Sequence, residues 1–214
     1  TLKAAKLKAK GLSGVSYERI RDELFKILER PGSFSYLEEL DKLKILKIII
    51  PEIEVMRKVK QGPYHHLDVW QHTLETVRQL EVVITELKNS REVQEYLDEV
   101  ISPNRSRRAL IKLGALLHDI GKPAAKRQED GKTKFHGHER IGTDITKDIA
   151  ERLKLSNDEM DALEKMVLWH LRPGYLADNE EVTPRAIFRY FRDTKKEGVS
   201  VLLISLADQR ATKG

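Results

Sequence analysis

Apolar residues recur every three or four positions along nearly the whole chain, which is the spacing of one face of an α-helix. In the first clear segment, Ile20, Leu24 and Leu28 form one apolar stripe, and Pro31-Gly32 ends it. No segment shows the alternation of apolar and polar residues that is typical of a half-buried β-strand. The pattern therefore predicts an all-α protein.

Proline, glycine and helix-capping residues divide this pattern into separate helices. The start signals are the capping-box pairs Ser35–Glu38 and Ser156–Glu159 and the Thr183-Pro184 dipeptide. The predicted helices cover residues 17–30, 35–50, 68–87, 92–101, 107–118, 138–153, 157–170 and 199–210, with another beginning at 184. Segment 107–118 is apolar almost all round, which predicts a buried central helix. Segment 121–137 is polar and is predicted to be a loop.

The Gln61-Gly62-Pro63 segment predicts a boundary between two parts of the chain. We expect a small helical region over residues 1–60 and a larger helical bundle over residues 61–214. The sequence starts at Thr1 without an initiating Met and ends without a tail, so we expect a fragment of a longer protein.

The amino-acid composition indicates a soluble protein without disulfides. Hydrophobic residues make up 40% of the chain and charged residues 34%, as in a soluble globular protein rich in exposed helix. Cysteine is absent, which excludes disulfides and thiolate metal sites. No apolar run is long enough for a membrane span or a signal peptide, so we expect a cytoplasmic protein with no membrane partner.

The net charge of +5 is concentrated in three basic clusters. Such clusters would suit a polyanion, RNA above all, and the alternative for each is a solvated helix surface. The third cluster follows directly on the histidine-aspartate pair described below. The clusters are Lys3, Lys6, Lys8 and Lys10; Arg105, Arg107 and Arg108; and Lys122, Lys126, Arg127, Lys132 and Lys134.

Several ionisable residues fall on apolar helix faces. Burying a carboxylate is costly unless it is paired or ligates a metal, and one cation would explain all of these residues together. A single histidine on a helix is otherwise more often a hydrogen-bonded core or surface residue. His138 is favoured over the neighbouring His136 because it begins a helix, and His65 and His66 are expected to be exposed. The candidate ligands are His72, His118, Asp119, His138, His170 and Asp208.

The candidate ligands follow a characteristic order along the chain. A single histidine comes first, then a His-Asp pair followed by Gly-Lys, and finally a distant aspartate: His72, His118-Asp119, Gly121-Lys122 and Asp208. This order resembles the signature of the HD metal-dependent phosphohydrolase superfamily. The resemblance implies a helical fold and a divalent-metal site. Members with a second metal carry further histidines, and Gly137-His138-Glu139 and Trp169-His170 are similar to those positions.

A closer resemblance is to the C-terminal part of bacterial tRNA nucleotidyltransferases (CCA-adding enzymes) and related poly(A) polymerases. Residues 16–24 look like the opening of their RNA-binding neck, and residues 68–74 look like the start of their HD domain. Those enzymes transfer nucleotides through a domain with a Gly-Ser turn and an Asp-x-Asp pair. Gly32-Ser33 leads into a helix here and no Asp-x-Asp occurs, so we expect no nucleotide addition by this chain alone.

The ligand types suit Mn, Ni, Co, Fe or Zn, and suit Mg less well, with one or two ions bound. We expect His72, His118, Asp119 and Asp208 to hold one ion. Asp119, a catalytic residue in this interpretation, would bridge to a second ion at His138 and His170. Two such ions can clamp a phosphate and activate water for in-line attack.

Two cations close to these motifs are candidates for binding the substrate. Lys122, also assigned as catalytic, and Arg172 could neutralise charge on the phosphate, and the alternative for both is a surface cation. The family resemblance implies 2′,3′-cyclic phosphodiesterase or phosphatase activity on a nucleotide or RNA end, with tRNA as a candidate partner. The alternatives are an RNA-binding body with a non-catalytic HD site, and a nucleotide sensor. The oligomeric state is open.

Overall fold

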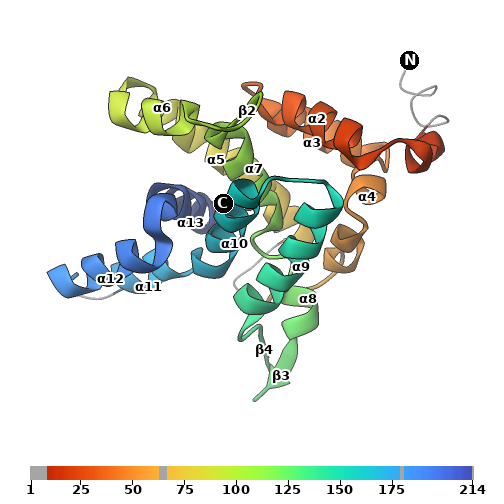
Figure 1. Cartoon of the computed structure of the whole chain (residues 1–214). Coiled ribbons are helices and arrows are strands. Elements are labelled where there is room, and N and C mark those ends of the chain that lie inside the picture. The colour runs from red at the N-terminus through yellow and green to blue at the C-terminus, as the bar shows by residue number, and fades with distance from the viewer. Residues whose placement is uncertain (1–8, 63–66, 179–180, 214) are drawn as a thin grey trace.

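The computed structural model describes residues 9–62, 67–178 and 181–213, which fold into a predominantly helical protein (Figure 1). Lys3, Lys6, Lys8, His65 and His66 lie outside these ranges, and the side chain of Lys10 is not described either. The α-helices are α2 (Tyr17–Leu28), α3 (Ser33–Lys42), α4 (Leu46–Ile49), α5 (Val69–Glu86), α6 (Arg91–Asp98), α7 (Arg107–Leu117), α8 (Lys122–Ala125), α9 (His138–Arg152), α10 (Asn157–Trp169), α11 (Arg172–Ala177), α12 (Pro184–Thr194) and α13 (Gly198–Lys213). Short 3₁₀ helices are η1 (Ala9–Gly14), η2 (Pro51–Met56), η3 (Leu87–Asn89) and η4 (Lys195–Glu197). The prediction of an all-α fold is confirmed, because the described strands form only two small two-stranded sheets.

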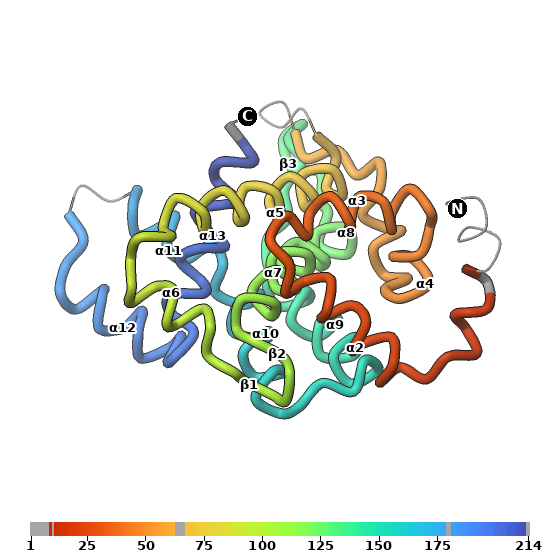
Figure 2. Tube along the Cα trace, turned by 90° about the horizontal axis from the view of Figure 1, so that it is seen from above, coloured from red at the N-terminus to blue at the C-terminus, as the bar shows by residue number. Residues whose placement is uncertain are grey.

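The centre of the core is α7, as its continuous apolar sequence predicted. All its residues from Ala109 to Leu117 are buried. It packs between α5 and α10, while α5 also runs along α13 and α10 along α9 (Figures 1 and 2). Helix α7 is therefore joined through α5 to α13 and through α10 to α9. No helix in the described ranges is long and apolar enough to cross a membrane.

The N-terminal helices pack directly on this bundle. Helix α2 lies against α7, and its apolar residues belong to the same hydrophobic core. The buried ammonium of Lys112 donates to the backbone carbonyls of Leu28 and Arg30, at 2.8 Å each. Glu29 accepts from the backbone N–H of Ser106 at 2.7 Å. The regions expected at 1–60 and 61–214 therefore share one core in this structure.

Helix α3 begins at Ser33, so the helix start predicted from Ser35 and Glu38 was wrong. The backbone N–H groups of Ser33 and Phe34 donate to the carboxylate of Glu81 on α5, at 2.7 and 3.3 Å. A helix N-terminus is stabilised by negative charge and by partners for its free N–H groups. A residue distant in sequence thus supplies the cap.

Other segments also depart from the predicted helices. The single helix expected over 35–50 is divided into α3 and α4 by a turn in which Lys44 has a positive φ of 61°. The loop expected over 121–137 contains α8 and an antiparallel hairpin of β3 (Arg127–Glu129) and β4 (Lys132–Lys134). The hairpin projects from the lower edge of the molecule in Figure 1. A second small sheet joins β1 (Val100–Ser102) to β2 (Arg105–Ser106), so the helix predicted over 92–101 ends earlier, at Asp98.

The arginines of the cluster at 105–108 are all paired with carboxylates of the fold. Arg107 is completely buried and pairs with Glu197 and Glu99. Arg105 and Arg108 are likewise paired with acidic residues. Their charges are compensated within the fold, where they connect β2 and α7 to neighbouring helices.

The ion pair between Arg105 and Glu159 leads to a prediction on stability. Burial raises the pKa of Glu159, but hydrogen bonds from Arg105 and Ser156 outweigh it and hold the pKa below its ordinary value of 4.5. A carboxylate of this kind stabilises the fold above its ordinary pKa and loses that effect as the pH falls through its folded-state pKa. Glu159→Gln should therefore lower the free energy of unfolding by about 2–3 kcal/mol at pH 7.

Urea unfolding from pH 7 down to pH 3 would test this prediction. The difference between the parent and Glu159→Gln should shrink as the pH falls below the ordinary carboxyl pKa. The control is Glu23→Gln, because Glu23 is 72% exposed and should change stability by no more than about 0.5 kcal/mol. A difference that stays constant with pH would contradict the assignment.

Candidate metal centre

The six predicted ligands come together from five helices of the core or from the residues that directly follow them. His72 lies on α5 and Asp208 on α13, and these two helices pack along each other. His118 and His170 are the C-terminal capping residues of α7 and α10, and Asp119 follows His118. His138 is the first residue of α9.

The first ligand set is His72, His118, Asp119 and Asp208, whose nearest ligand atoms all lie within 4.8 Å of one another. His72 Nε2 is 2.7 Å from Asp208 Oδ1 and 3.7 Å from Asp119 Oδ2. His118 Nε2 is 3.2 Å from Asp119 Oδ2 and 3.7 Å from Asp208 Oδ1. Two imidazoles and two carboxylates thus converge on one point.

The second ligand set is Asp119, His138 and His170, which also lie within 4.8 Å of one another. His138 Nε2 and His170 Nε2 are 3.3 and 3.8 Å from Asp119 Oδ1. Asp119 therefore turns one carboxylate oxygen to each set. A carboxylate with this arrangement can bridge two cations.

The tautomers of three histidines follow from their outer hydrogen bonds. The Nδ1 atoms of His118, His138 and His170 each contact a backbone carbonyl three residues earlier, at 2.8, 2.8 and 2.6 Å. A carbonyl only accepts, so each Nδ1 carries a proton and each ring points Nε2 to the centre, where its lone pair would bind a metal. This is the usual way in which a protein orients histidine ligands.

The contacts inside the cluster fit a metal better than they fit a set of hydrogen bonds. His138 Nε2 and His170 Nε2 lie 3.3 Å apart, and with both protons on Nδ1 the two lone pairs face each other. Two nitrogens bound to one tetrahedral metal at 2.0–2.1 Å are separated by about 3.3 Å. His118 Nε2 is buried and has no hydrogen-bond partner among the described residues. Cations in the two ligand sets would satisfy these three nitrogens.

The pKa shifts show how strongly these groups interact. Burial raises the pKa of Asp119, but the charges of His118 and Lys122 outweigh it and hold that pKa well below its usual range. Burial opposes protonation of His118, yet the two carboxylates raise its pKa to about 10. Burial and the charge of His118 lower the pKa of His170 to about 3. The carboxylates are therefore charged and available as ligands.

Lys122 lies at the edge of this cluster. Its ammonium is 2.6 Å from Asp119 Oδ2 and donates to Gln61 Oε1 at 2.6 Å. The Lys122 side chain is 12% exposed and that of Asp208 18%, so these two form the most accessible side of the site. Sequence patterns did not indicate Gln61, because it stands in a segment interpreted only as a domain boundary.

A close backbone approach holds the His-Asp turn against the start of α9. A Cβ atom on Gly121 would lie 2.1 Å from the carbonyl oxygen of His138 and 2.5 Å from the N of Gly142. Only glycine permits this contact without moving backbone. The packing therefore places His138 beside Asp119.

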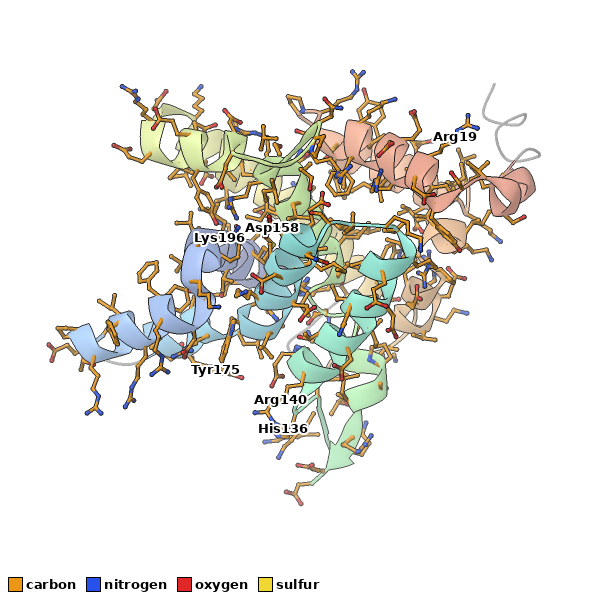
Figure 3. All side chains as sticks on the ribbon, in the orientation of Figure 1. Arg19, His136, Arg140, Asp158, Tyr175 and Lys196 are labelled. Atoms are coloured by element: carbon orange, nitrogen blue, oxygen red, sulfur yellow. The ribbon has the colours of Figure 1, made fainter. Side chains whose placement is uncertain are left out.

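Two further residues that the sequence analysis considered, Arg172 and His136, lie outside the ligand cluster. Arg172 donates to Asp193 at 2.6 Å and lies over the ring of Trp169, and no described contact joins it to the ligand cluster. Its role in binding a phosphate stays a prediction. His136, the alternative to His138, is exposed and lies near Arg140 at the surface (Figure 3). His136 is in neither ligand set.

Comparison with known protein families agrees with this arrangement. Residues 64–212 match the HD domain family. The chain belongs to the HD-domain family. Residues 1–56 match a second family, described as the probable RNA- and SrmB-binding site of polymerase A. The neck-plus-HD organisation inferred by resemblance is thus confirmed.

Curated relatives include two tRNA nucleotidyltransferases. The chain is 31% identical to the A-adding enzyme of Deinococcus radiodurans over 99% of its own length and 43% of the relative's. It is 27% identical to the CC-adding enzyme of Thermus thermophilus, over 92% of the chain and 40% of that protein. A bifunctional uridylyltransferase/uridylyl-removing enzyme of Cereibacter sphaeroides is 29% identical over 71% of the chain and 15% of that protein. The chain thus spans less than half the length of these relatives.

Proposed function

We propose that the chain is a metal-dependent phosphohydrolase that cleaves a phosphate ester of a nucleotide or of an RNA end. The observation that carries this proposal is the placement of Asp119, whose two oxygens face two separate sets of histidine nitrogens. Such a donor set suits divalent transition metals, among them Mn, Ni, Co, Fe and Zn. Metal ions held there would polarise a phosphate and lower the pKa of an attacking water.

The residues of the site would have different roles in hydrolysis. The histidines hold the site through their fixed tautomers, and Asp119 and Asp208 supply the negative charge that retains a cation. Lys122, positioned by Asp119 and Gln61, would neutralise charge that develops on the phosphate oxygens. The protein needs no serine or cysteine nucleophile, since water attacks phosphorus and the alcohol leaves with a proton.

The relatives support this choice of chemistry and substrate. A uridylyl group is held by a phosphate ester, so the name of the Cereibacter relative includes phosphate-ester cleavage. The tRNA nucleotidyltransferases point to an RNA end, tRNA in particular. A test is hydrolysis of 2′,3′-cyclic AMP and of a generic aryl phosphodiester, with each metal added in turn. A folded chain that turns over neither substrate with any metal would refute the proposal.

Histidines 138 and 136 offer a matched pair for testing the second ligand set. His138→Ala should reduce the bound metal by one equivalent and lower kcat by about 100-fold or more, because a ligand is lost. His136→Ala changes the same residue type two positions earlier, on the surface, and should leave both values unchanged. Metal content by mass spectrometry and initial rates measure the effects. Equal losses in both variants would contradict the assignment.

A second candidate function is an RNA-binding body whose HD site does not turn over substrate, which the RNA-binding family match at 1–56 favours. In that case the chain would bind tRNA in a salt-sensitive way, and His118→Ala would leave the affinity intact. The absence of hydrolysis together with unchanged tRNA affinity in this variant would decide for the second candidate.

A further inference from the structure

A hollow of about 710 Å³ lies between the segment leading into α5 and the β3–β4 hairpin. This volume is within the range of about 300–1,000 Å³ that is usual for ligand sites. In Figure 2 the hairpin and the start of α5 lie next to each other at the upper edge of the molecule. One wall includes Lys58, Lys60 and Asp68, and the other includes Gln128 and Lys132.

The charge of this hollow is positive and largely uncompensated. Lys58, Lys60 and Lys132 are exposed, and none forms an ion pair with another described residue. The carboxylate of Asp68, also in the lining, accepts from the backbone N–H groups of Lys58 and Gln71, at 2.7 and 2.8 Å. It is therefore occupied as a helix cap. Three lysines remain to attract an anion with several charges.

Residues adjacent in sequence to both walls of the hollow contact Lys122 at the metal centre. Gln61, which follows Lys60, accepts from the Lys122 ammonium at 2.6 Å. Phe135, which follows β4, has its ring centre 5.7 Å from the same ammonium. Lys122 in turn is 2.6 Å from Asp119. The two segments that form the hollow therefore also contact the proposed catalytic residues.

Gln61 also offers a donor beside Lys122. The ammonium of Lys122 can only donate, so the amide oxygen of Gln61 must face it and the amide nitrogen must point elsewhere. That nitrogen is buried and has no hydrogen-bond partner among the described residues, while the whole residue is only 6% exposed. A buried donor without a partner costs free energy, which a bound phosphate oxygen would recover.

We propose that this hollow binds the backbone of a single-stranded RNA and leads its 3′ end to Lys122. The proposal rests on the proposed function for the reaction at that end. A row of lysines suits the repeated phosphates of a strand, whereas a free nucleotide would need only the groups beside Lys122. The RNA-binding family match at residues 1–56 favours RNA over other polyanions.

The test is the affinity of the full chain, loaded with Mn²⁺, for a 5′-fluorescein-labelled RNA decamer that ends in a 3′-hydroxyl. The double variant Lys60→Glu/Lys132→Glu should raise Kd at least about tenfold at about 100 mM salt. It should also reduce the slope of log Kd against log salt by about 1.4, since each phosphate contact on a single strand contributes about 0.7. Fluorescence anisotropy measures both values.

The control is Lys88→Glu/Lys147→Glu, which changes the net charge equally at exposed lysines outside the hollow. Its Kd should stay within about twofold of the parent's. Equal weakening by both double variants, or AMP binding to the parent as tightly as the decamer, would overturn the proposal.

The same measurements separate this proposal from the proposed function. His118→Ala should abolish hydrolysis of 2′,3′-cyclic AMP and change the Kd of the decamer by less than about threefold. An equal loss of decamer binding in this variant would place the RNA on the metal centre alone and overturn the hollow's role. If no metal supports hydrolysis but the lysine variants lose RNA affinity, the proposed function fails and the RNA-binding role stands.

Discussion

Asp119→Ala is expected to release the bound metal from both ligand sets and to lower kcat/KM for 2′,3′-cyclic AMP by at least about 1,000-fold. Loss of a single outer partner of a metal ligand usually costs about 10–100-fold, and Asp119 serves two sets at once. Its carboxylate, 1% exposed, faces His118 on one side and His138 on the other. Metal content and steady-state kinetics on the same preparation measure the two effects.

Two further variants make this result interpretable. Asp119→Asn keeps the shape of the side chain and should lose metal and activity while the circular dichroism spectrum is retained. Asp144→Ala removes an exposed carboxylate on α9 and should match the parent in both measurements. Retention of a tenth or more of the activity by Asp119→Ala would contradict the central position given to this residue.

Gly121→Ala is expected to lower the free energy of unfolding by about 3 kcal/mol or more, because its Cβ would overlap backbone rather than a movable side chain. The added atom would lie 2.1 Å from His138 O. Relief requires the start of α9 to move away from the His118-Asp119 turn. The variant should therefore lose hydrolysis even at temperatures where it is folded.

Urea unfolding compares this variant with Gly14→Ala. No atom of the described residues lies within 4 Å of a Cβ placed on Gly14, and its φ is not positive, so the change should be within about 0.5 kcal/mol. Equal stability of the two variants would show that the turn and α9 are not held by this contact.

Local sequence patterns predicted those features of the fold that depend on residues close together in the chain. The buried helix α7 follows from an apolar surface on all sides. The capping box of Ser156 and Glu159 forms as expected, and so does the cap of α12 by Thr183. The six ligand candidates were found because charged groups on apolar faces need a partner, and the structure brings them together.

The remaining features depend on residues far apart in the chain. Glu81 sets the start of α3 from another helix. Arg107 is buried because it pairs with Glu197, which stands 90 positions away in the sequence, although the neighbouring arginines suggested a surface cluster. Gln61 has a role at the site only through Lys122. Spacing along one sequence contains no signal for such pairs.

Anomalous diffraction from crystals grown with Mn²⁺, Ni²⁺ or Zn²⁺ tests the central claim most directly. We expect a peak about 2.0–2.2 Å from His72 Nε2, His118 Nε2 and oxygens of Asp119 and Asp208. A second peak is expected near His138 and His170 when two ions are bound. No peak among these residues at saturating metal, or a peak confined to another part of the molecule, would contradict the account.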